Sequence, residues 1–117
     1  MKRVILSLLL FVLPGLPPLE AHAFLKRAEP SVGSTVRTSP VEVRIWFTEK
    51  IGSGSIQIVD TSNKQLDKRN ARVDRTDQSL LRVSLQPLQP GTYKVLWRVV
   101  SLDTHGTKGN FTFQVAP

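Results

Sequence analysis

Alternation of apolar and polar residues with a period of two is the feature that most constrains the fold of this chain. The longest example runs from Thr92 to Ser101, where Tyr93, Val95, Trp97 and Val99 share one face. This alternation predicts a β-strand with one buried side and one side facing solvent. Four more segments repeat the pattern: Val41–Phe47, Ser55–Asp60, Leu81–Leu85 and Phe111–Val115.

Turn-forming residues separate these segments, and no stretch keeps a helical period for three turns. The predicted turns are at Pro30 and Gly33, Ser39-Pro40, Gly52-Ser53-Gly54, Ser62-Asn63-Lys64, Pro87 with Pro90-Gly91, and Gly106 with Gly109. With two weaker strands near Ala23–Arg27 and Ala71–Arg75, the sequence predicts an antiparallel β-sandwich of about seven strands. Its core should hold the alternating face that includes Val41, the two tryptophans Trp46 and Trp97, and the pair Phe111 and Phe113.

The first residues have the three parts of a secretory signal. A basic start, Met1–Arg3, precedes the mainly apolar run Val4–Leu13 and the helix-breaking segment Pro14–Ala21. The apolar run is about half of the roughly 20 residues that span a bilayer. We predict a cleaved leader over residues 1–21 and one domain over residues 22–117. Cleavage after Ala23 is an alternative on leader rules alone, because residues 21–23 also match a signal-peptidase site.

Cysteine content and charge restrict the classes of fold and function that the chain can have. The chain has no cysteine, so neither a lipid anchor at the cleavage site nor a disulfide framework is possible, and apolar burial must hold the fold. The net charge is +7, of which residues 22–117 carry +6. The basic residues of that part are scattered, and export argues against a nucleic-acid partner. We interpret most of this charge as solvated strand surface.

The two histidines, His22 and His105, are the main candidates for chemistry. Cleavage after Ala21 would give His22 a terminal amine beside its imidazole, and the pair can chelate a metal. Asp103 has the same parity as His105, so in an extended strand the two side chains would leave on one side, about 6.5–7 Å apart. The only methionine is Met1, within the leader. A donor set of nitrogen and oxygen without sulfur suits Cu(II), Ni(II) or Zn(II), and a tetragonal arrangement favours Cu(II).

Other interpretations of the same residues stay open at this point. Asp103 could orient His105 or cap a turn, with no metal involved. A catalytic triad of His105, Asp103 and a serine such as Ser101 or Ser53 is disfavoured, because the chain has no nucleophile motif of the G-x-S-x-G type.

Several segments together resemble the CopC family of periplasmic copper-resistance proteins. They are His22–Lys26, Glu29-Pro30, Phe47–Glu49, the long run Gly91–His105 and the closing Gly109–Val115. The resemblance implies an immunoglobulin-like Greek-key sandwich whose mature chain begins at His22. It implies one Cu(II) ion per chain, bound by His22, Asp103 and His105, with Glu49 as a further weak ligand or a support for the ligands.

The resemblance also implies a role. We expect a periplasmic, monomeric protein that sequesters or transports copper or confers resistance to it, and that is not an enzyme. A CopD-type inner-membrane copper transport protein is the expected partner. Family members with a second, Cu(I) site have a methionine-rich loop, whereas residues 22–117 contain no methionine, so we expect no such site. The alternatives are a copper-dependent oxidase or monooxygenase and a metal-free immunoglobulin-like interaction module.

Overall fold

The structure, a computed structural model, describes residues 22–117, and all regular secondary structure in that range is β-strand. The strands are β1 (Leu25–Glu29), β2 (Thr35–Val36), β3 (Glu42–Phe47), β4 (Ile51–Val59), β5 (Arg72–Val73), β6 (Leu80–Ser84), β7 (Gly91–Ser101) and β8 (Gly106–Val115). The all-β prediction is confirmed, and the two-residue strand β2 is the addition to the predicted set. The predicted leader, residues 1–21, lies outside the described residues.

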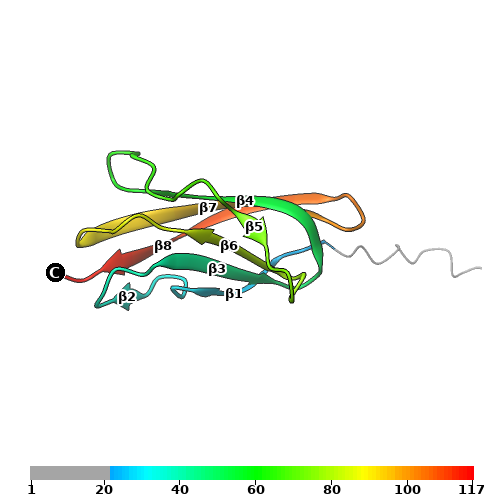
Figure 1. Ribbon diagram of the computed structural model, residues 1–117, viewed down its shortest axis with the longest axis horizontal. Coiled ribbons are helices and arrows are strands. Elements are labelled where there is room, and N and C mark those ends of the chain that lie inside the picture. The colour runs from blue at the N-terminus through cyan, green and yellow to red at the C-terminus, as the bar shows by residue number, and fades with distance from the viewer. Residues whose placement is uncertain (1–21) are drawn as a thin grey trace, which may run out of the picture.

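The strands form two sheets that pack face to face (Figure 1), in the orders β1-β3-β6-β5 and β2-β8-β7-β4. Neighbouring strands are antiparallel except β2 and β8, which pair in parallel. The chain changes sheet at each connection from β1 to β5 and again between β6 and β7. These crossings are those of a Greek-key sandwich. Between residues 22 and 117 there is no helix long and apolar enough to cross a membrane.

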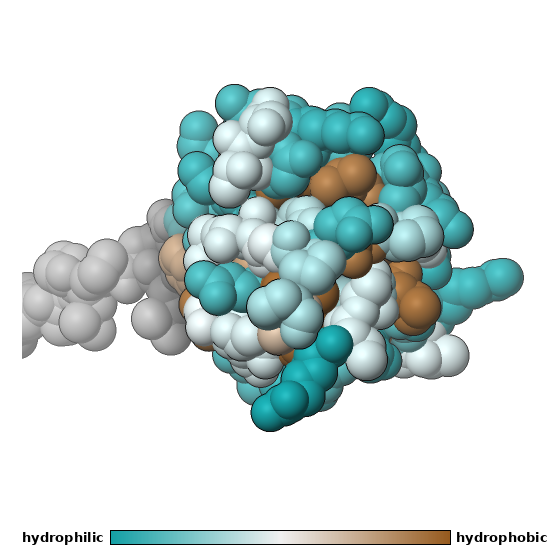
Figure 2. Space-filling view, turned by 90° about the vertical axis from the view of Figure 1, so that its left-hand side faces the viewer, coloured by the Kyte–Doolittle hydropathy of each residue, from teal (hydrophilic) through white to brown (hydrophobic). Residues whose placement is uncertain are grey.

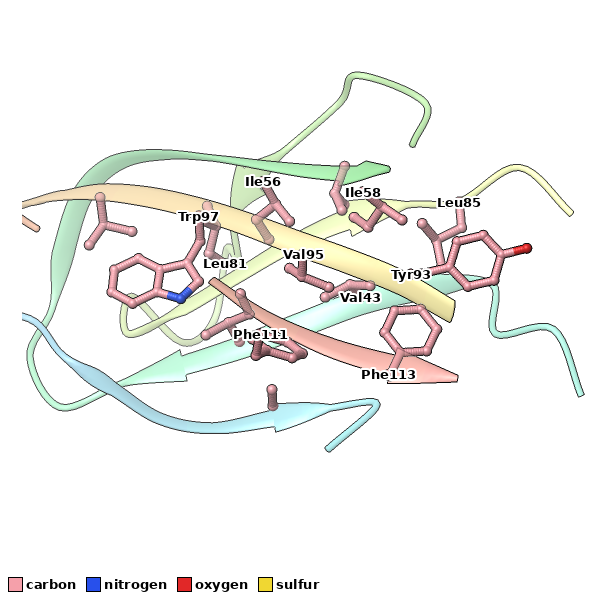
Figure 3. Close-up of a cluster of buried hydrophobic side chains, with 14 of the residues drawn as sticks. Val43, Ile56, Ile58, Leu81, Leu85, Tyr93, Val95, Trp97, Phe111 and Phe113 are labelled. Atoms are coloured by element: carbon pink, nitrogen blue, oxygen red, sulfur yellow. The ribbon is translucent and has the colours of Figure 1, made fainter. Parts of the chain in front are cut away.

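The core lies between the sheets and is built from the alternating residues of the central strands (Figure 3). In β7 the side chains of Tyr93, Val95, Trp97 and Val99 are buried, and the residues between them face outward. Trp97 meets Phe47 edge to face with ring centroids 5.1 Å apart. The predictions that Trp97, Phe111 and Phe113 belong to the core are therefore confirmed.

Two predicted turns are strands in the structure. Segment 52–54 belongs to β4, where a register shift marks a bulge, and segment 106–109 belongs to β8. Their glycines make room for packing. A Cβ atom at Gly54 would lie 2.9 Å from a core methyl group, and one at Gly109 would lie 2.6 Å from the Trp97 ring. Glycine in a strand often marks such a close approach.

Two residues predicted for the core lie outside it. Val41 precedes β3 and is 80% exposed, because the regular pairing of β3 begins at Glu42. Trp46 is half-buried on the outer face of β3, where the Arg27 guanidinium lies 3.6 Å from its ring centroid. Strand parity places Trp46 outward, and stacking with arginine covers its face.

The two ends of the sandwich differ. The N-terminal segment, the β3–β4 connection and the β7–β8 turn meet at one end (Figure 1). Figure 2 looks onto the opposite end, which is mainly hydrophilic with small, separate hydrophobic patches.

Candidate metal site

The residues before β1 are tied to the sandwich by two threonines. The Phe24 amide donates to Thr48 Oγ1 at 3.0 Å, and the Thr48 amide donates to the Phe24 carbonyl at 2.8 Å. Thr48 Oγ1 also donates to the His22 carbonyl at 3.4 Å. On the other side, Thr107 Oγ1 donates to the carbonyl of the fully buried Ala23 at 2.6 Å. These bonds fix the backbone of His22 between the end of β3 and the start of β8.

The β7–β8 connection that carries Asp103 and His105 is a tight turn, and the extended backbone expected there is wrong. The Ser101 amide donates to the His105 carbonyl, and the Thr104 amide donates to the Ser101 carbonyl, both at 2.9 Å. Thr104 has a positive φ of 70°. The turn brings the two side chains closer than a strand would, with Asp103 Oδ1 3.3 Å from His105 Nδ1.

The two histidines meet at this end of the molecule, although they are far apart in the sequence. Their ring centroids lie 4.7 Å apart with the rings tilted by 46°. His22 is half-buried, and the His105 side chain is 53% exposed. The structure thus brings together the two imidazoles and, through His105, the Asp103 carboxylate.

A buried serine holds the Asp103 carboxylate. Ser101 is 3% exposed, and its hydroxyl donates to Asp103 Oδ1 and lies 3.1 Å from the His105 carbonyl. The Ser101 hydrogen bond is the main cause that lowers the pKa of Asp103, with smaller contributions from the backbone and the ring of His105. All of the contacts to the Asp103 carboxylate described above fall on Oδ1. Asp103 therefore contacts both the backbone amide and the ring of His105 within the turn.

Glu49 is not brought into this group by any contact in the structure. It is exposed and follows the end of β3 by two positions. Across residues 22–117, no three His, Cys, Asp or Glu side chains already converge as a metal-ligand cluster. The predicted ligands instead approach in pairs, His22 with His105 and His105 with Asp103.

The donors present suit a borderline divalent metal. Two imidazoles and one carboxylate supply nitrogen and oxygen without sulfur, a set that copper, nickel and zinc accept. In the full-length chain the His22 nitrogen is part of the peptide bond to Ala21. The amine of the predicted chelate exists only once that bond is cut, so the full donor set belongs to the processed chain.

Comparison with known proteins assigns the chain to a family, because the CopC domain profile matches residues 25–116. The chain belongs to the CopC family. It is 36% identical over 102 residues to protein YobA of Escherichia coli K12, covering 85% of this chain and 82% of YobA. Among solved structures, CopC from Methylosinus trichosporium OB3b is similar with a TM-score of 0.77 and 32% identity, covering 82% of this chain and 95% of that one. PcoC, a methionine-rich copper resistance protein from Escherichia coli, is similar with a TM-score of 0.69 and 31% identity, covering 81% and 99%.

Three residues that shape this end of the CopC-family sandwich were missed by the sequence analysis. Thr48 and Thr107 hold the N-terminal segment, and Ser101 holds Asp103. Thr48 follows β3 and Thr107 lies within β8, and neither position in the sequence indicates a bond to the segment before β1. Ser101 did carry a signal, because it is a small polar residue at a buried position of β7, where buried hydroxyls need a partner.

Proposed function

We propose that the processed protein is a periplasmic Cu(II)-binding protein that holds one copper ion per chain for sequestration, transport or resistance. Membership of the CopC family and the likeness to PcoC, a copper resistance protein, support the metal. The observation that carries the proposal is the meeting of His22 and His105, with ring centroids 4.7 Å apart. One of these histidines becomes the terminal residue if the leader is removed after Ala21.

Each donor has a proposed role. The amine and imidazole of His22 chelate the ion, and the imidazole of His105 adds the third nitrogen. Because His105 Nδ1 faces Asp103, its Nε2 is the nitrogen left for the metal. Asp103 contributes an axial or weak oxygen through Oδ2. Glu49 stays a proposed weak ligand or support for the ligands.

The test compares two proteins that differ only at the N-terminus. Both begin at His22, and in the second an acetyl group blocks the His22 amine, which leaves every side chain intact but removes the terminal amine as a ligand. Native mass spectrometry with one equivalent of Cu(II) should show one retained copper on the first protein and much weaker retention on the second.

His105→Ala, starting at His22, should weaken binding but leave the terminal chelate. Equal copper retention by the free and the acetylated His22 proteins would contradict the role of the amine. Retention by neither would favour the metal-free module. The intact mass of the exported natural protein reports the cleavage position in the same instrument.

Copper affinity should fall as the pH is lowered. Protons compete with the metal for the amine and both imidazoles, so affinity should decline through the range in which histidine side chains ordinarily titrate, around pH 6.5. A competition titration at several pH values measures this decline. An affinity that stays constant from neutral pH to about 4, well below that range, would argue against histidine ligands.

We propose a single site without a Cu(I) counterpart and no enzymatic activity. Residues 22–117 contain no methionine, in contrast to PcoC, which is described as methionine-rich. At the proposed site the Ser101 hydroxyl is directed to Asp103 and not to an imidazole, so no serine–histidine pair is set up there. A Cu(I) titration should find no tight stoichiometric binding, and the copper-loaded protein should not turn over a reductant or polysaccharide.

We also propose a monomer that exchanges copper with a CopD-type inner-membrane transport protein, as the family resemblance implies. The exposed side chains of Phe24 and Leu102, 56% and 55% accessible, lie close in sequence to the proposed ligands and give a partner an apolar contact there. Light scattering tests the monomer, and co-purification with the membrane protein tests the partner.

A further inference from the structure

The outer face of the sheet β2-β8-β7-β4 has cations but no ion pairs. Lys94 and Arg98 of β7 and Lys108 of β8 are exposed on this face. In the described part of the chain, none of them has a carboxylate within ion-pairing distance. The nearest acid at the far edge, Asp60, accepts hydrogen bonds from the amides of its own turn.

On the outer face of the other sheet, three arginines are paired with acids. There Arg27 and Arg44 pair with Glu29 at 3.2 and 2.7 Å, and Arg82 pairs with Glu42 and Asp74 at 2.8 and 2.5 Å. The excess positive charge of the domain is therefore not evenly spread, and one sheet face carries an uncompensated part of it.

Arg98 and Lys108 stand directly opposite each other across β7 and β8. Like charges at opposed positions destabilise a sheet. An anion placed between them would relieve this repulsion, so the pair disfavours the free state relative to a state with an anionic ligand.

A shallow groove surrounds this pair. It has a volume of about 510 Å³, and its lining side chains include Ser55, Gln57, Leu96, Arg98, Lys108 and Asn110. Gln57, Leu96 and Asn110 form the row next to the cations, since Leu96 pairs with both of the others. The groove thus offers two cations for carboxylates, two amides that can bind a peptide backbone, and one half-exposed leucine between them.

We propose that this groove binds an extended, acidic segment of a partner protein. Arg98 and Lys108 would take its carboxylates, and Gln57 and Asn110 would take its backbone groups. An anionic membrane is a poorer fit, because lipid-binding surfaces gather about 4–8 basic residues, whereas three occupy this face.

The groove is close to the proposed copper site along β7. Val100, two positions beyond Arg98, pairs with Gly106, which directly follows His105. A segment bound in the groove would therefore hold its parent protein beside the site. The binding itself goes beyond the proposed function and needs no copper, while its use in copper exchange rests on that function.

The experiment uses the metal-free protein starting at His22 and a synthetic peptide of alternating aspartate and serine. Backbone amide NMR shifts map the contact, and titration at low salt gives the affinity. The test variant is Arg98→Ser with Lys108→Ser. The matched control is Arg75→Ser with Lys68→Ser, which removes the same two charges from exposed positions elsewhere.

We expect shifts centred on β4, β7 and β8, and an affinity at least about fivefold lower in the test variant than in the control, as the loss of two surface ion pairs implies. Equal weakening in both variants would show that only net charge matters, and shifts elsewhere or no binding would also overturn the proposal. Anionic phospholipid vesicles form a second arm, and binding to them that depends on Arg98 and Lys108, with none to the peptide, would assign the face to a membrane. Copper titration of the same variants distinguishes failure of this proposal from failure of the proposed copper site, because copper binding should be unchanged in both variants.

Discussion

Replacing Ser101 by alanine tests whether the proposed copper site depends on a residue that does not touch the metal. In the structure the Ser101 hydroxyl donates to Asp103 Oδ1, which also lies 3.3 Å from both the amide nitrogen and the ring nitrogen Nδ1 of His105. Alanine removes one of three contacts on that oxygen. The backbone of the turn should persist, because the Ser101 amide still donates to the His105 carbonyl at 2.9 Å.

The expected loss of Cu(II) affinity is about tenfold. Removing a group that orients a metal ligand costs about 10–100-fold in affinity. The lower end applies here, since two of the three contacts remain and the Asp103 side chain is 38% exposed, so water replaces part of the lost bond.

A chelator-competition titration gives the affinity, and the electron paramagnetic resonance spectrum reports the Cu(II) ligand set. Ser79→Ala is the matched control, because the Ser79 hydroxyl also donates to an aspartate, Asp77, at 2.7 Å. We expect Ser79→Ala to leave affinity and spectrum unchanged. If Ser101→Ala also left both unchanged, or if the two variants lost affinity equally, the argument that Ser101 positions the ligands would be refuted.

Three further predictions concern packing, the N-terminal segment and acid stability. Gly109→Ala should destabilise the fold by about 1–3 kcal/mol by overpacking, because the new methyl carbon would lie 2.6 Å from the Trp97 ring. An unchanged melting temperature and unchanged tryptophan fluorescence would contradict this prediction. Thr48→Val should weaken copper binding without unfolding the protein, because it removes the hydroxyl that holds the backbone on both sides of Ala23, and a titration with unaltered affinity would show that this hydroxyl is dispensable. Hydrogen bonds from Thr76, and to a smaller extent from Arg82, lower the pKa of Asp74 to about 2, and the hydrogen bond from Arg82 lowers the pKa of Glu42. The stabilisation from these carboxylates is therefore full above their unfolded pKa of about 4 and is lost as the pH falls towards about 2. For Arg82→Met, the free energy of unfolding measured by chemical denaturation should therefore fall less steeply with decreasing pH than it does for the natural chain.

The strands and the inward faces were predictable because period-two alternation is a local property. In β7 each inward residue is buried as its parity requires. The predictions fail where a contact with another strand determines the position of a residue. Glycines 52, 54, 106 and 109 suggest turns by themselves, yet the structure places them in strands, where Gly54 lies close to the core side chains of Val99 and Leu81 and Gly109 lies close to the Trp97 ring. Trp46 suggests core by its type, but the register of β3 turns it toward Arg27.

The sequence by itself determined the all-β class and the donor chemistry, because residues 22–117 contain no cysteine or methionine and only two histidines besides the acids. Only the tertiary structure decided which donors meet. Hydrogen bonds from Thr48 and Thr107 bring His22 to the turn at His105, and that turn brings Asp103 to the His105 ring. The tertiary structure also determines which charges are paired. Ion pairs across β1, β3 and β6 neutralise arginines on the face of one sheet, whereas Arg98 and Lys108 lie together on the face of the other. Such contacts depend on sheet order and register, which side-chain periodicity within single strands does not encode.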